Sequence, residues 1–340
     1  MNALVTGGGG FIGSALAREL VIRGDHAASF SRGDYPHLRR LGIETVRGDL
    51  SDREAVLKAC AGRDVVFHVA AKAGMWGSRR EYYQANVQCT ENVVRACQVQ
   101  GVGRLVFTSS ASVVFDGSNI EGGNESLPYP TRPMSHYTAT KAIAEQCVIA
   151  ANTSKLKTLS LRPHLVWGPG DRHIIPGIIA RARAGRMRRI GDGDNRVDTT
   201  YIDNAVAAHI SAAETMTQYP CVTGKAYFIS NGEPVLLMKF INSILKSASL
   251  PPVRKHVSVK TALAIAGLLE FVYKGFGIKT EPPITRFLVH ELSTTHWFNI
   301  SAARESLGYK PKITMHEGMK RLAEYYRRMD TTLHETSPAE

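Results

Sequence analysis

Apolar runs of strand length alternate with stretches of helical periodicity along the first half of the chain. The predicted strands lie at 3–5, 26–30, 43–47, 64–69, 105–110 and 156–162. Between them, apolar residues recur at helical spacing, and the longest such stretches are 79–100 and 134–152. Strands that alternate with helices form a parallel sheet with helices on both faces. We therefore predict an α/β fold built on a doubly wound parallel sheet.

The first apolar run leads directly into a glycine-rich turn. Four glycines beginning at Gly7 follow it, and Phe11, Ile12 and Gly13 open the next helical stretch. Glycine permits a tight turn and leaves no Cβ between the backbone and a pyrophosphate, and a helix N-terminus offers free N–H groups. The strand–turn–helix context favours a dinucleotide site over a glycine-rich surface loop. We predict that Gly7, Gly10, Phe11, Ile12 and Gly13 hold the diphosphate.

The second predicted strand ends at Ser31 and Arg32. NAD-binding folds usually place an acidic residue near this point, where it accepts a hydrogen bond from the ribose 2′-hydroxyl. A hydroxyl and a guanidinium suit a 2′-phosphate instead. We therefore expect NADP(H) to be preferred, with NAD(H) as the alternative. Asp34, three residues past Ser31, is the acidic residue that would favour NAD(H), and Arg32 could also be an ordinary surface arginine.

Two polar motifs are candidates for chemistry. Tyr137 and Lys141 are four residues apart and therefore share a helix face. Because an adjacent ammonium favours the phenolate, we expect Lys141 to lower the pKa of Tyr137. Ser109 and Ser110 end a predicted strand, at the sheet edge where a hydroxyl can hold a substrate carbonyl. Taken alone, Tyr137 and Lys141 could be an ordinary surface pair, and the serines could belong to a serine-rich loop that caps the next turn.

Charge and cysteine content narrow the class of function. The 340-residue chain has a formal net charge of +12, and its densest basic cluster lies at 181–189. This cluster lacks interleaved aromatic residues, so we predict no nucleic-acid partner and interpret it as a solvated helix face or a membrane-attracted surface. The five cysteines are scattered, so we expect reduced thiols and no metal site. Because we find neither a membrane-spanning apolar run nor a signal peptide, we expect a cytoplasmic protein, with membrane association as the alternative.

Together, and in this order, the motifs resemble the extended short-chain dehydrogenase/reductase family. The resemblance covers most of the chain and rests on the glycine turn, Asp49-Leu50, His68-x-Ala70-Ala71, the serine strand end, Tyr137-x-x-x-Lys141 and Leu161-Arg162-Pro163. It implies a Rossmann-type NADP-binding domain at 1–167, to which 196–230 return. It also implies a smaller C-terminal substrate-binding domain at 168–195 and 231–330. We expect 331–340 to form a flexible tail.

The resemblance implies roles for single residues. Tyr137 matches the family's catalytic acid/base, Lys141 its partner, and Ser110 the hydroxyl that orients the substrate, with Ser109 as the alternative. Asn86 matches an active-site asparagine on a helix, and Pro163 the turn behind the nicotinamide. Beyond the glycine turn, the expected cofactor contacts are Ser31, Arg32, Asp49, Leu50, Ala70, Ala71, Lys72, Ser109, Tyr137, Lys141, Pro163 and Val166.

Within the family, segments 191–205 and 299–303 are similar to the 3β-hydroxysteroid dehydrogenase branch. That branch includes sterol-4-carboxylate dehydrogenases and bacterial 2-alkyl-3-oxoalkanoate reductases, and both act on a 3-oxygen of a hydrophobic molecule. Because Ser31-Arg32 replaces the acidic residue of NAD-using steroid members, we favour NADPH-dependent reduction of a 2-alkyl-3-oxoalkanoate. The alternatives are a 3β-hydroxysteroid or sterol-4-carboxylate dehydrogenase, a nucleotide-sugar epimerase or dehydratase, and a non-catalytic NADP(H)-binding sensor.

The largely apolar stretch 257–277 fits a hydrophobic substrate. It is too short to span a bilayer, so we consider a tunnel wall or lid, a peripheral membrane contact and a plain core helix. The family likeness also implies a homodimer through the helices at 79–100 and 134–152. We further expect Arg172, His173 and Arg196 to lie near a substrate carboxylate.

Overall fold

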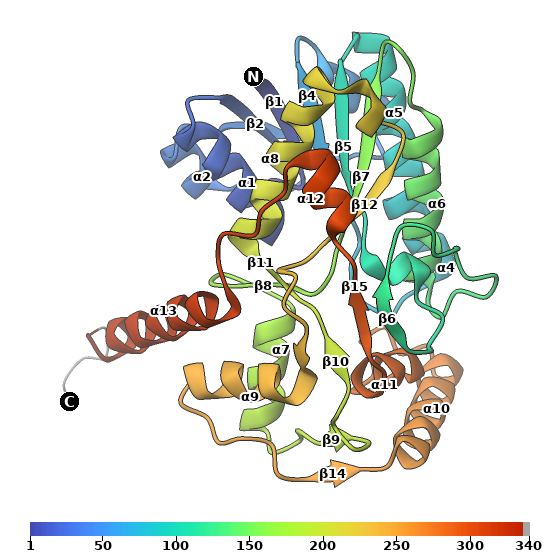
Figure 1. The fold of residues 1–340 in the computed structure, drawn as a ribbon, viewed down its shortest axis with the longest axis vertical. Coiled ribbons are helices and arrows are strands. Elements are labelled where there is room, and N and C mark those ends of the chain that lie inside the picture. The colour runs from blue at the N-terminus through green and yellow to red at the C-terminus, as the bar shows by residue number, and fades with distance from the viewer. Residues whose placement is uncertain (336–340) are drawn as a thin grey trace.

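A seven-stranded parallel sheet forms one half of the molecule, in a computed structural model that describes residues 1–335. The strand order is β12-β7-β5-β4-β1-β2-β3, so the chain crosses between the two sides of β1. This arrangement confirms the predicted doubly wound parallel sheet (Figure 1). The strands are β1 (Asn2–Thr6), β2 (His26–Ser31), β3 (Glu44–Arg47), β4 (Val65–His68), β5 (Arg104–Thr108), β7 (Lys157–Pro163) and β12 (Ala226–Ile229).

Strand periodicity divides the interior of this half into two layers. Ala3 and Val5 of β1 belong to one buried cluster and Leu4 to the other, because successive side chains of a strand point to opposite faces. Helices α1 (Phe11–Ile22) and α8 (Ile202–Gln218) contact each other over the first face. The second face is covered by α3 (Arg53–Cys60), α5 (Cys89–Gln100) and α6 (His136–Ala150).

Local sequence signals set the helix starts on the second face. The Asp52 carboxylate caps α3 by accepting from the N–H groups of Glu54 and Ala55, as a helix that begins after residue 52 requires. Ser135 and Thr138 form a reciprocal capping box at the start of α6. This box fixes the first turn of α6, on which Tyr137 lies.

The prediction of one uniform helix over 79–100 is wrong in its middle. The segment is divided into α4 (Arg79–Tyr82), a π-helical segment η1 (Tyr83–Gln88) and α5. Thr90 turns its hydroxyl back to the Asn86 carbonyl at 2.6 Å, which satisfies an acceptor inside the wider turn. Apolar periodicity does not distinguish the two helix types, and π segments occur often at functional sites.

The second half of the molecule has short strands and separate helices, drawn in the lower part of Figure 1. Its largest sheet has four strands in the order β13-β10-β15-β6. Its strands are β6 (Ile120–Gly123), β8 (Val166–Trp167), β9 (Arg189–Ile190), β10 (Arg196–Val197), β11 (Thr200–Tyr201), β13 (Val235–Leu236), β14 (His256–Val257) and β15 (His296–Phe298). Across both halves, the helices not yet named are α2 (Pro36–Arg40), η2 (Ala111–Val114), α7 (Ile174–Arg183), η3 (Pro220–Val222), α9 (Leu237–Ser247), α10 (Val259–Gly275), α11 (Arg286–Ser293), α12 (Ser301–Leu307) and α13 (Met315–Glu335).

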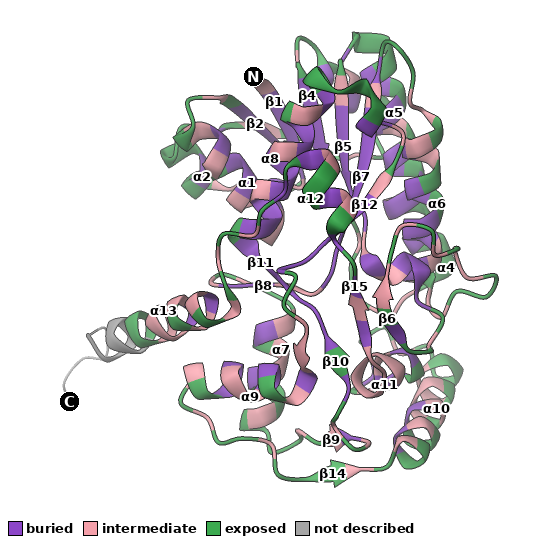
Figure 2. Ribbon diagram, viewed as in Figure 1, coloured by how far each residue is buried: buried purple, intermediate pink, exposed green. Residues whose placement is uncertain are grey.

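Helix α10 has few buried residues for its length. Only Ala262 and Ala266 of its residues are buried, whereas Leu268 and Phe271 are 64% and 75% exposed. Figure 2 shows this contrast, with α10 largely exposed and the strands of the large sheet buried. The interpretation of 257–277 as a plain core helix is therefore wrong, because Ile265, Leu268 and Phe271 are exposed and the other large apolar side chains of α10 are only half-buried. No helix within the described residues is long and apolar enough to cross a membrane.

The C-terminal helix α13 runs to Glu335 and so extends into the segment for which we expect a flexible tail. In Figure 1, α13 projects to one side of the body. Residues 336–340 of that expected tail lie outside the described residues.

Candidate active site

The glycine turn forms a cradle that has no space for side chains. Gly7 has φ +70°, and its N–H donates to the Phe30 carbonyl at 2.8 Å. A Cβ on Gly13 would lie 2.3 Å from the Gly7 oxygen, and one on Gly7 would lie 2.8 Å from Ala70 Cα. The N-cap of α1 is Gly10, whose lack of a side chain leaves the first N–H groups of the helix uncapped. These features fit a bound diphosphate, with Phe11 next in the chain.

Cationic groups surround the end of β2. Arg32 is exposed, and the Arg47 side chain donates to its carbonyl at 3.2 Å. Asp34 is paired with Arg39, whose hydrogen bond holds the pKa of that carboxyl below its usual range. The acidic residue that favoured NAD(H) in the sequence is therefore already neutralised by a neighbour. Ser31 lies at the end of the same strand and is partly exposed.

Asp49 and Leu50 follow β3 at the same edge of the sheet. The Ser51 N–H and hydroxyl both donate to the Asp49 carboxylate at 2.8 Å. The backbone bond from Ser51 is the main reason that the pKa of Asp49 is lowered, and the charge of Arg32 adds to it. Asp49 is therefore an ionised acceptor near Arg32, at the carboxyl edge where ligands bind.

The structure brings Tyr137 and Ser110 together. Ser110 follows β5 and caps η2, where its hydroxyl accepts from the Ser112 N–H at 3.2 Å. The Ser110 hydroxyl lies close enough to the phenol of Tyr137 to lower its pKa. Ser109 instead is buried beneath this edge, and its N–H donates to the Leu161 carbonyl at 2.7 Å. Of the two candidate serines, only Ser110 therefore presents its hydroxyl to the tyrosine.

Lys141 is fully enclosed one helical turn beyond Tyr137. Its ammonium donates to the Thr108 carbonyl at 2.6 Å and lies 4.0 Å from the centre of the Phe107 ring. Burial lowers the pKa of Lys141 to about 7, although the Glu145 carboxylate opposes this change. Lys141 is thus a cation that can lose its proton close to neutral pH.

The expectation that Lys141 lowers the pKa of Tyr137 is wrong for this structure. Burial raises the pKa of the phenol, the neighbouring Ser110 hydroxyl opposes the rise, and the charge of Glu291 adds to it. The Lys141 ammonium is not among the groups that shift this pKa, and its contacts are with the Thr108 carbonyl and the Phe107 ring. The tyrosine is therefore kept protonated, which is the state that a proton donor needs.

Asn86 holds the chain after β4 in place. Its side-chain oxygen accepts from the Lys72 N–H at 2.7 Å, and its amide donates to the Lys72 carbonyl at 3.2 Å and to the Thr140 hydroxyl at 3.1 Å. Ala70 and Ala71 are thus positioned from both sides, since the Ala70 N–H also donates to Thr6. The buried Asn86 joins three parts of the predicted site and has no free polar atom for substrate.

The corner after β7 carries Pro163 and Val166. Leu165 between them has φ +41°, a backbone conformation that residues other than glycine rarely adopt. The His164 N–H donates to the Ile229 carbonyl at 3.1 Å, and the Thr200 hydroxyl donates to the His164 carbonyl at 2.8 Å. These bonds hold a strained corner that the sequence does not predict.

Some residues important to this site are absent from the sequence-based prediction. Glu145, one turn past Lys141 on α6, is buried and binds Arg162 at 2.7 Å and the Ser160 hydroxyl at 2.8 Å. The spacing Tyr137-x-x-x-Lys141-x-x-x-Glu145 places all three on one helix face, and this signal could have been recognised. Glu291, from α11, has no such signal because it is distant in sequence.

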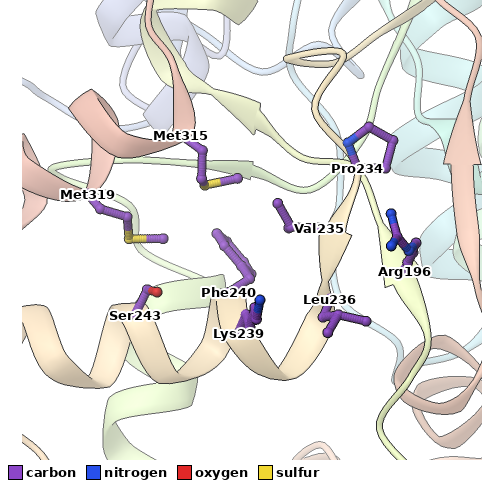
Figure 3. Close-up of a pocket in the computed structure, with 9 residues that line it drawn as sticks. All are labelled: Arg196, Pro234, Val235, Leu236, Lys239, Phe240, Ser243, Met315 and Met319. Carbon is purple, nitrogen blue, oxygen red and sulfur yellow. The ribbon is translucent and has the colours of Figure 1, made fainter.

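Arg172 and Arg196, two of the residues expected near a substrate carboxylate, have different surroundings. Arg172 reaches the glycine turn and donates to the Gly9 carbonyl at 3.2 Å. Arg196 lines a cavity of about 260 Å³ in the second half of the molecule (Figure 3). That cavity does not include Tyr137, and its other lining residues are Pro234, Val235, Leu236, Lys239, Phe240, Ser243, Met315 and Met319. In this cavity two cationic side chains, Arg196 and Lys239, lie beside apolar walls, and Ser110 is not among the lining residues either.

Comparison with known proteins identifies the family. The sequence model of the 3-beta hydroxysteroid dehydrogenase/isomerase family matches residues 4–258. The chain belongs to this family. The match extends from the glycine turn through the strained corner and the beginning of the second half, so it confirms the resemblance to the 3β-hydroxysteroid dehydrogenase branch.

Curated members of the family include enzymes of two kinds. The chain is 49% identical to a 2-alkyl-3-oxoalkanoate reductase of Stenotrophomonas maltophilia, over 95% of this chain and 98% of that one. It is 45% identical to a 2-alkyl-3-oxoalkanoate reductase of Shewanella oneidensis, over 94% and 85%. It is 34% identical to the decarboxylating sterol-4-alpha-carboxylate 3-dehydrogenase of Mus musculus, over 96% and 91%.

Solved structures of the same fold include a protein described as MoeE5 in complex with UDP-glucose and NAD. It superposes with a TM-score of 0.74 at 25% identity, over 97% of this chain and 99% of that one. These values support the Rossmann-type fold along the whole chain and its relation to nicotinamide-dependent proteins. They also show that the fold alone does not separate lipid from sugar substrates.

Proposed function

We propose that this protein is an NADPH-dependent oxidoreductase that reduces the 3-oxo group of a 2-alkyl-3-oxoalkanoate. The neighbouring hydroxyl groups of Ser110 and Tyr137, at the carboxyl edge of the sheet, are the observation that carries the proposal. Two hydroxyl groups that converge on one point can bind one ketone oxygen. The relatives at 49% and 45% identity support the substrate class.

The chain's own residues then divide the work of reduction. Ser110 and Tyr137 hold the carbonyl oxygen, and Tyr137 gives it a proton as negative charge develops there. The buried Lys141 positions the ribose and supplies a nearby proton-bearing group whose pKa of about 7 suits exchange. When bound, the nicotinamide supplies the hydride. Asn86 keeps the wall after β4 in register.

Preference for NADP(H) is part of the proposal. Arg32 and Arg47 lie at the adenosine end of the site, and Arg39 neutralises Asp34. A 2′-phosphate would meet cations there, whereas a plain ribose would find no free carboxylate on Asp34. NAD(H) remains the alternative cofactor, because the solved structure named above contains NAD.

The alternative functions differ from the proposed one in what they require. A sterol or sterol-4-carboxylate dehydrogenase needs the same hydroxyl pair and is supported by the relative at 34% identity. A nucleotide-sugar epimerase or dehydratase shares the fold, but exposed apolar groups on α10 fit a lipid better. A non-catalytic sensor does not need the Ser110–Tyr137–Lys141 arrangement.

One assay separates these functions. NADPH oxidation is followed with 2-alkyl-3-oxo acids, 3-oxosteroids and UDP-sugars as substrates, and NADH replaces NADPH in a parallel series. We expect turnover with the oxo acids and a higher kcat/KM with NADPH. Turnover only with steroids or UDP-sugars would replace the substrate assignment, and NADPH binding without turnover on any of them would favour the sensor.

We also infer a peripheral lipid contact through the exposed face of α10. Leu268 and Phe271 lie three residues apart on this face, and Phe276, 81% exposed, follows the helix. Lys274 and Lys279 are exposed beside them and would meet anionic headgroups. Trp76 of the segment after β4 contacts Tyr273 at 6.0 Å, so a lid role for the same helix is the alternative.

A cytoplasmic homodimer through α5 and α6 completes the proposal. Val99 and Ile143, on these two helices, are 55% and 41% exposed. Apolar groups on adjacent helices are what a two-fold helical interface buries. Light scattering of wild type and Ile143→Glu would test this, with a monomeric wild type as the contrary result.

A further inference from the structure

Three buried residues from distant parts of the chain form a polar cluster behind the active site. His164 follows β7, Asp198 follows β10, and His296 begins β15. His164 Nδ1 lies 2.6 Å from Asp198 Oδ1, and His164 Nε2 lies 3.2 Å from His296 Nδ1. His296 Nε2 lies 2.8 Å from the Glu291 carbonyl oxygen. We call Asp198, His164 and His296 the histidine cluster.

The contacts of the cluster need more hydrogens than two neutral imidazoles carry. An ionised Asp198 only accepts, so His164 Nδ1 must donate to it. The Glu291 carbonyl also only accepts, so His296 Nε2 must donate. The contact between the two rings needs a third hydrogen, whereas two neutral rings carry two. The histidine cluster therefore holds one proton beyond an ionised aspartate and two neutral histidines.

The surroundings place that proton on His164. Asp198 Oδ2 accepts the Phe298 N–H at 3.0 Å, and a hydrogen bond of this kind favours the ionised carboxylate. Burial and the charge of His164 lower the pKa of His296 to about 4, so His296 is the neutral ring. Within residues 1–335, no group of three or more His, Cys, Asp or Glu side chains is placed to hold a metal ion instead.

The histidine cluster touches both walls of the active site. His164 belongs to the strained corner that carries Pro163 and Leu165. The His296 ring lies 5.5 Å from the ring of Phe115, which ends the turn begun by Ser110. The corner and the catalytic serine turn are thus joined through one pair of rings.

We propose that His164 and His296 are positioning residues, and that the imidazolium they share fixes the Pro163–Val166 corner and the serine turn relative to each other. The expected cofactor contacts at Pro163 and Val166 then depend on a bond that breaks when the proton is lost. This proposal rests on the proposed function only for its second part, since the shared proton exists without any ligand.

Few other ionisable groups face the cluster. Glu291 on α11 is close enough for the charge of His164 to oppose the burial that raises the pKa of Glu291 to about 6. Tyr309 also faces Asp198, whose charge adds to the burial that raises the pKa of this phenol. His290, also on α11, turns away and contacts the Gly117 carbonyl at 3.2 Å. Phe115, Phe287 and Phe298 supply the rest of the nearby ring contacts.

The first experiment reads the proton directly. The ring nitrogen shifts of histidines labelled with ¹⁵N are measured by NMR in the ligand-free protein at pH 7, and His164→Gln and His296→Gln provide the assignments. We expect one imidazolium, at His164, and one neutral ring, at His296. Asp198→Asn should convert His164 to a neutral ring. Two neutral rings in the wild type would overturn the proposal.

The second experiment reads the positioning role by NADPH binding. A glutamine at 296 can accept from His164 with its oxygen and donate to the Glu291 carbonyl with its amide, whereas a leucine can do neither. We expect His296→Leu to weaken NADPH binding about tenfold and His296→Gln to restore it to within about threefold. His290→Asn is the control on the neighbouring helix and should bind NADPH as the wild type does.

Circular dichroism shows whether each variant is folded. Equal NADPH affinity of folded His296→Leu and His296→Gln would contradict the positioning role. If the wild type itself binds no NADPH, the proposed function fails, while the NMR measurement still decides whether the proton is shared.

Discussion

The two halves of the molecule differ in how their elements are held. Strands β1, β4, β5 and β7 each pair on both sides and consist mainly of buried residues. In the second half, most strands have two or three residues, and α10 buries only two of its seventeen. Local stability follows buried apolar contacts, so the first half is expected to be rigid and the second adaptable. The hydroxyl pair belongs to the rigid half, and the exposed apolar face of α10 belongs to the other.

The largest effect is expected from Tyr137 in the rigid half. Tyr137→Phe should lower kcat by at least about a hundredfold, because the general acid is lost while the ring is kept. NADPH affinity, measured by fluorescence, should stay within about threefold. Tyr83→Phe, on the exposed side of η1, is the control. Near-normal turnover of Tyr137→Phe would remove the tyrosine from the mechanism.

Adding one methyl group tests the rigidity of each half. Gly13→Ala places a Cβ 2.3 Å from the Gly7 oxygen, and backbone on both sides prevents relief. We expect a loss of about 1–3 kcal/mol in the free energy of unfolding and at least tenfold weaker NADPH binding. Gly275→Ala, at the end of α10, meets nothing within 4 Å and should leave both unchanged. Similar behaviour of the two variants would break the comparison.

Lys141→Met separates the requirements of stability from those of function. Turnover should fall at least tenfold, because the buried cation is lost. The unfolded lysine titrates near 10.5 and the folded one near 7, so burial of the charge costs stability in full below pH 7 and less as pH rises toward 10.5. The stability of the variant relative to wild type should therefore decline by about 1–2 kcal/mol from pH 7 to 9 in urea unfolding. A difference independent of pH would mean that Lys141 is not desolvated.

A change of charge at the adenosine end of the site, in the rigid half, is expected to alter only the preference between NADPH and NADH. Arg32→Glu should reduce the ratio of kcat/KM for NADPH to that for NADH at least about tenfold, because a charge-assisted bond to a 2′-phosphate becomes a repulsion. Arg40→Glu, an exposed residue on α2, is the matched change of charge. An equal effect of both variants would point to general electrostatics instead of a bound phosphate.

The smallest effect on folding is expected on α10. Leu268→Glu with Phe271→Glu should change the free energy of unfolding by less than about 0.5 kcal/mol, since both side chains are already in water. Co-sedimentation with vesicles containing anionic lipid should fall several-fold. Vesicle binding equal to that of the wild type would exclude a lipid contact through this face and leave the lid alternative.

Sequence patterns were informative where local chemistry determines structure. Positions 7 and 13 of the turn require glycine because both lie against neighbouring backbone. Ser135 marks the start of α6 through its capping box. The relation of Ser110 to Tyr137 follows from their places at the ends of adjacent elements. In these cases a few neighbouring residues contain the whole physical reason.

Other features depend on residues that only the fold brings together. The effect of Lys141 was misjudged because helix spacing gives its distance from Tyr137 but not its bond to Thr108. The histidine cluster joins positions 164, 198 and 296, which no periodicity relates. The sequence also does not determine whether α10 is buried or exposed, since an apolar sequence does not reveal what covers it.

The π-helical segment between Tyr82 and Cys89 has a consequence for how this chain tolerates length changes. A π-helical turn contains about one residue more than an α-helical turn. The side chains of α5, which follows this segment, are therefore rotated about the helix axis by about 100° relative to an uninterrupted α-helix. Deleting one residue there would restore regular winding and swing Asn86 away from Lys72 and Thr140. Between α4 and α5, therefore, the number of residues is constrained as firmly as their identity.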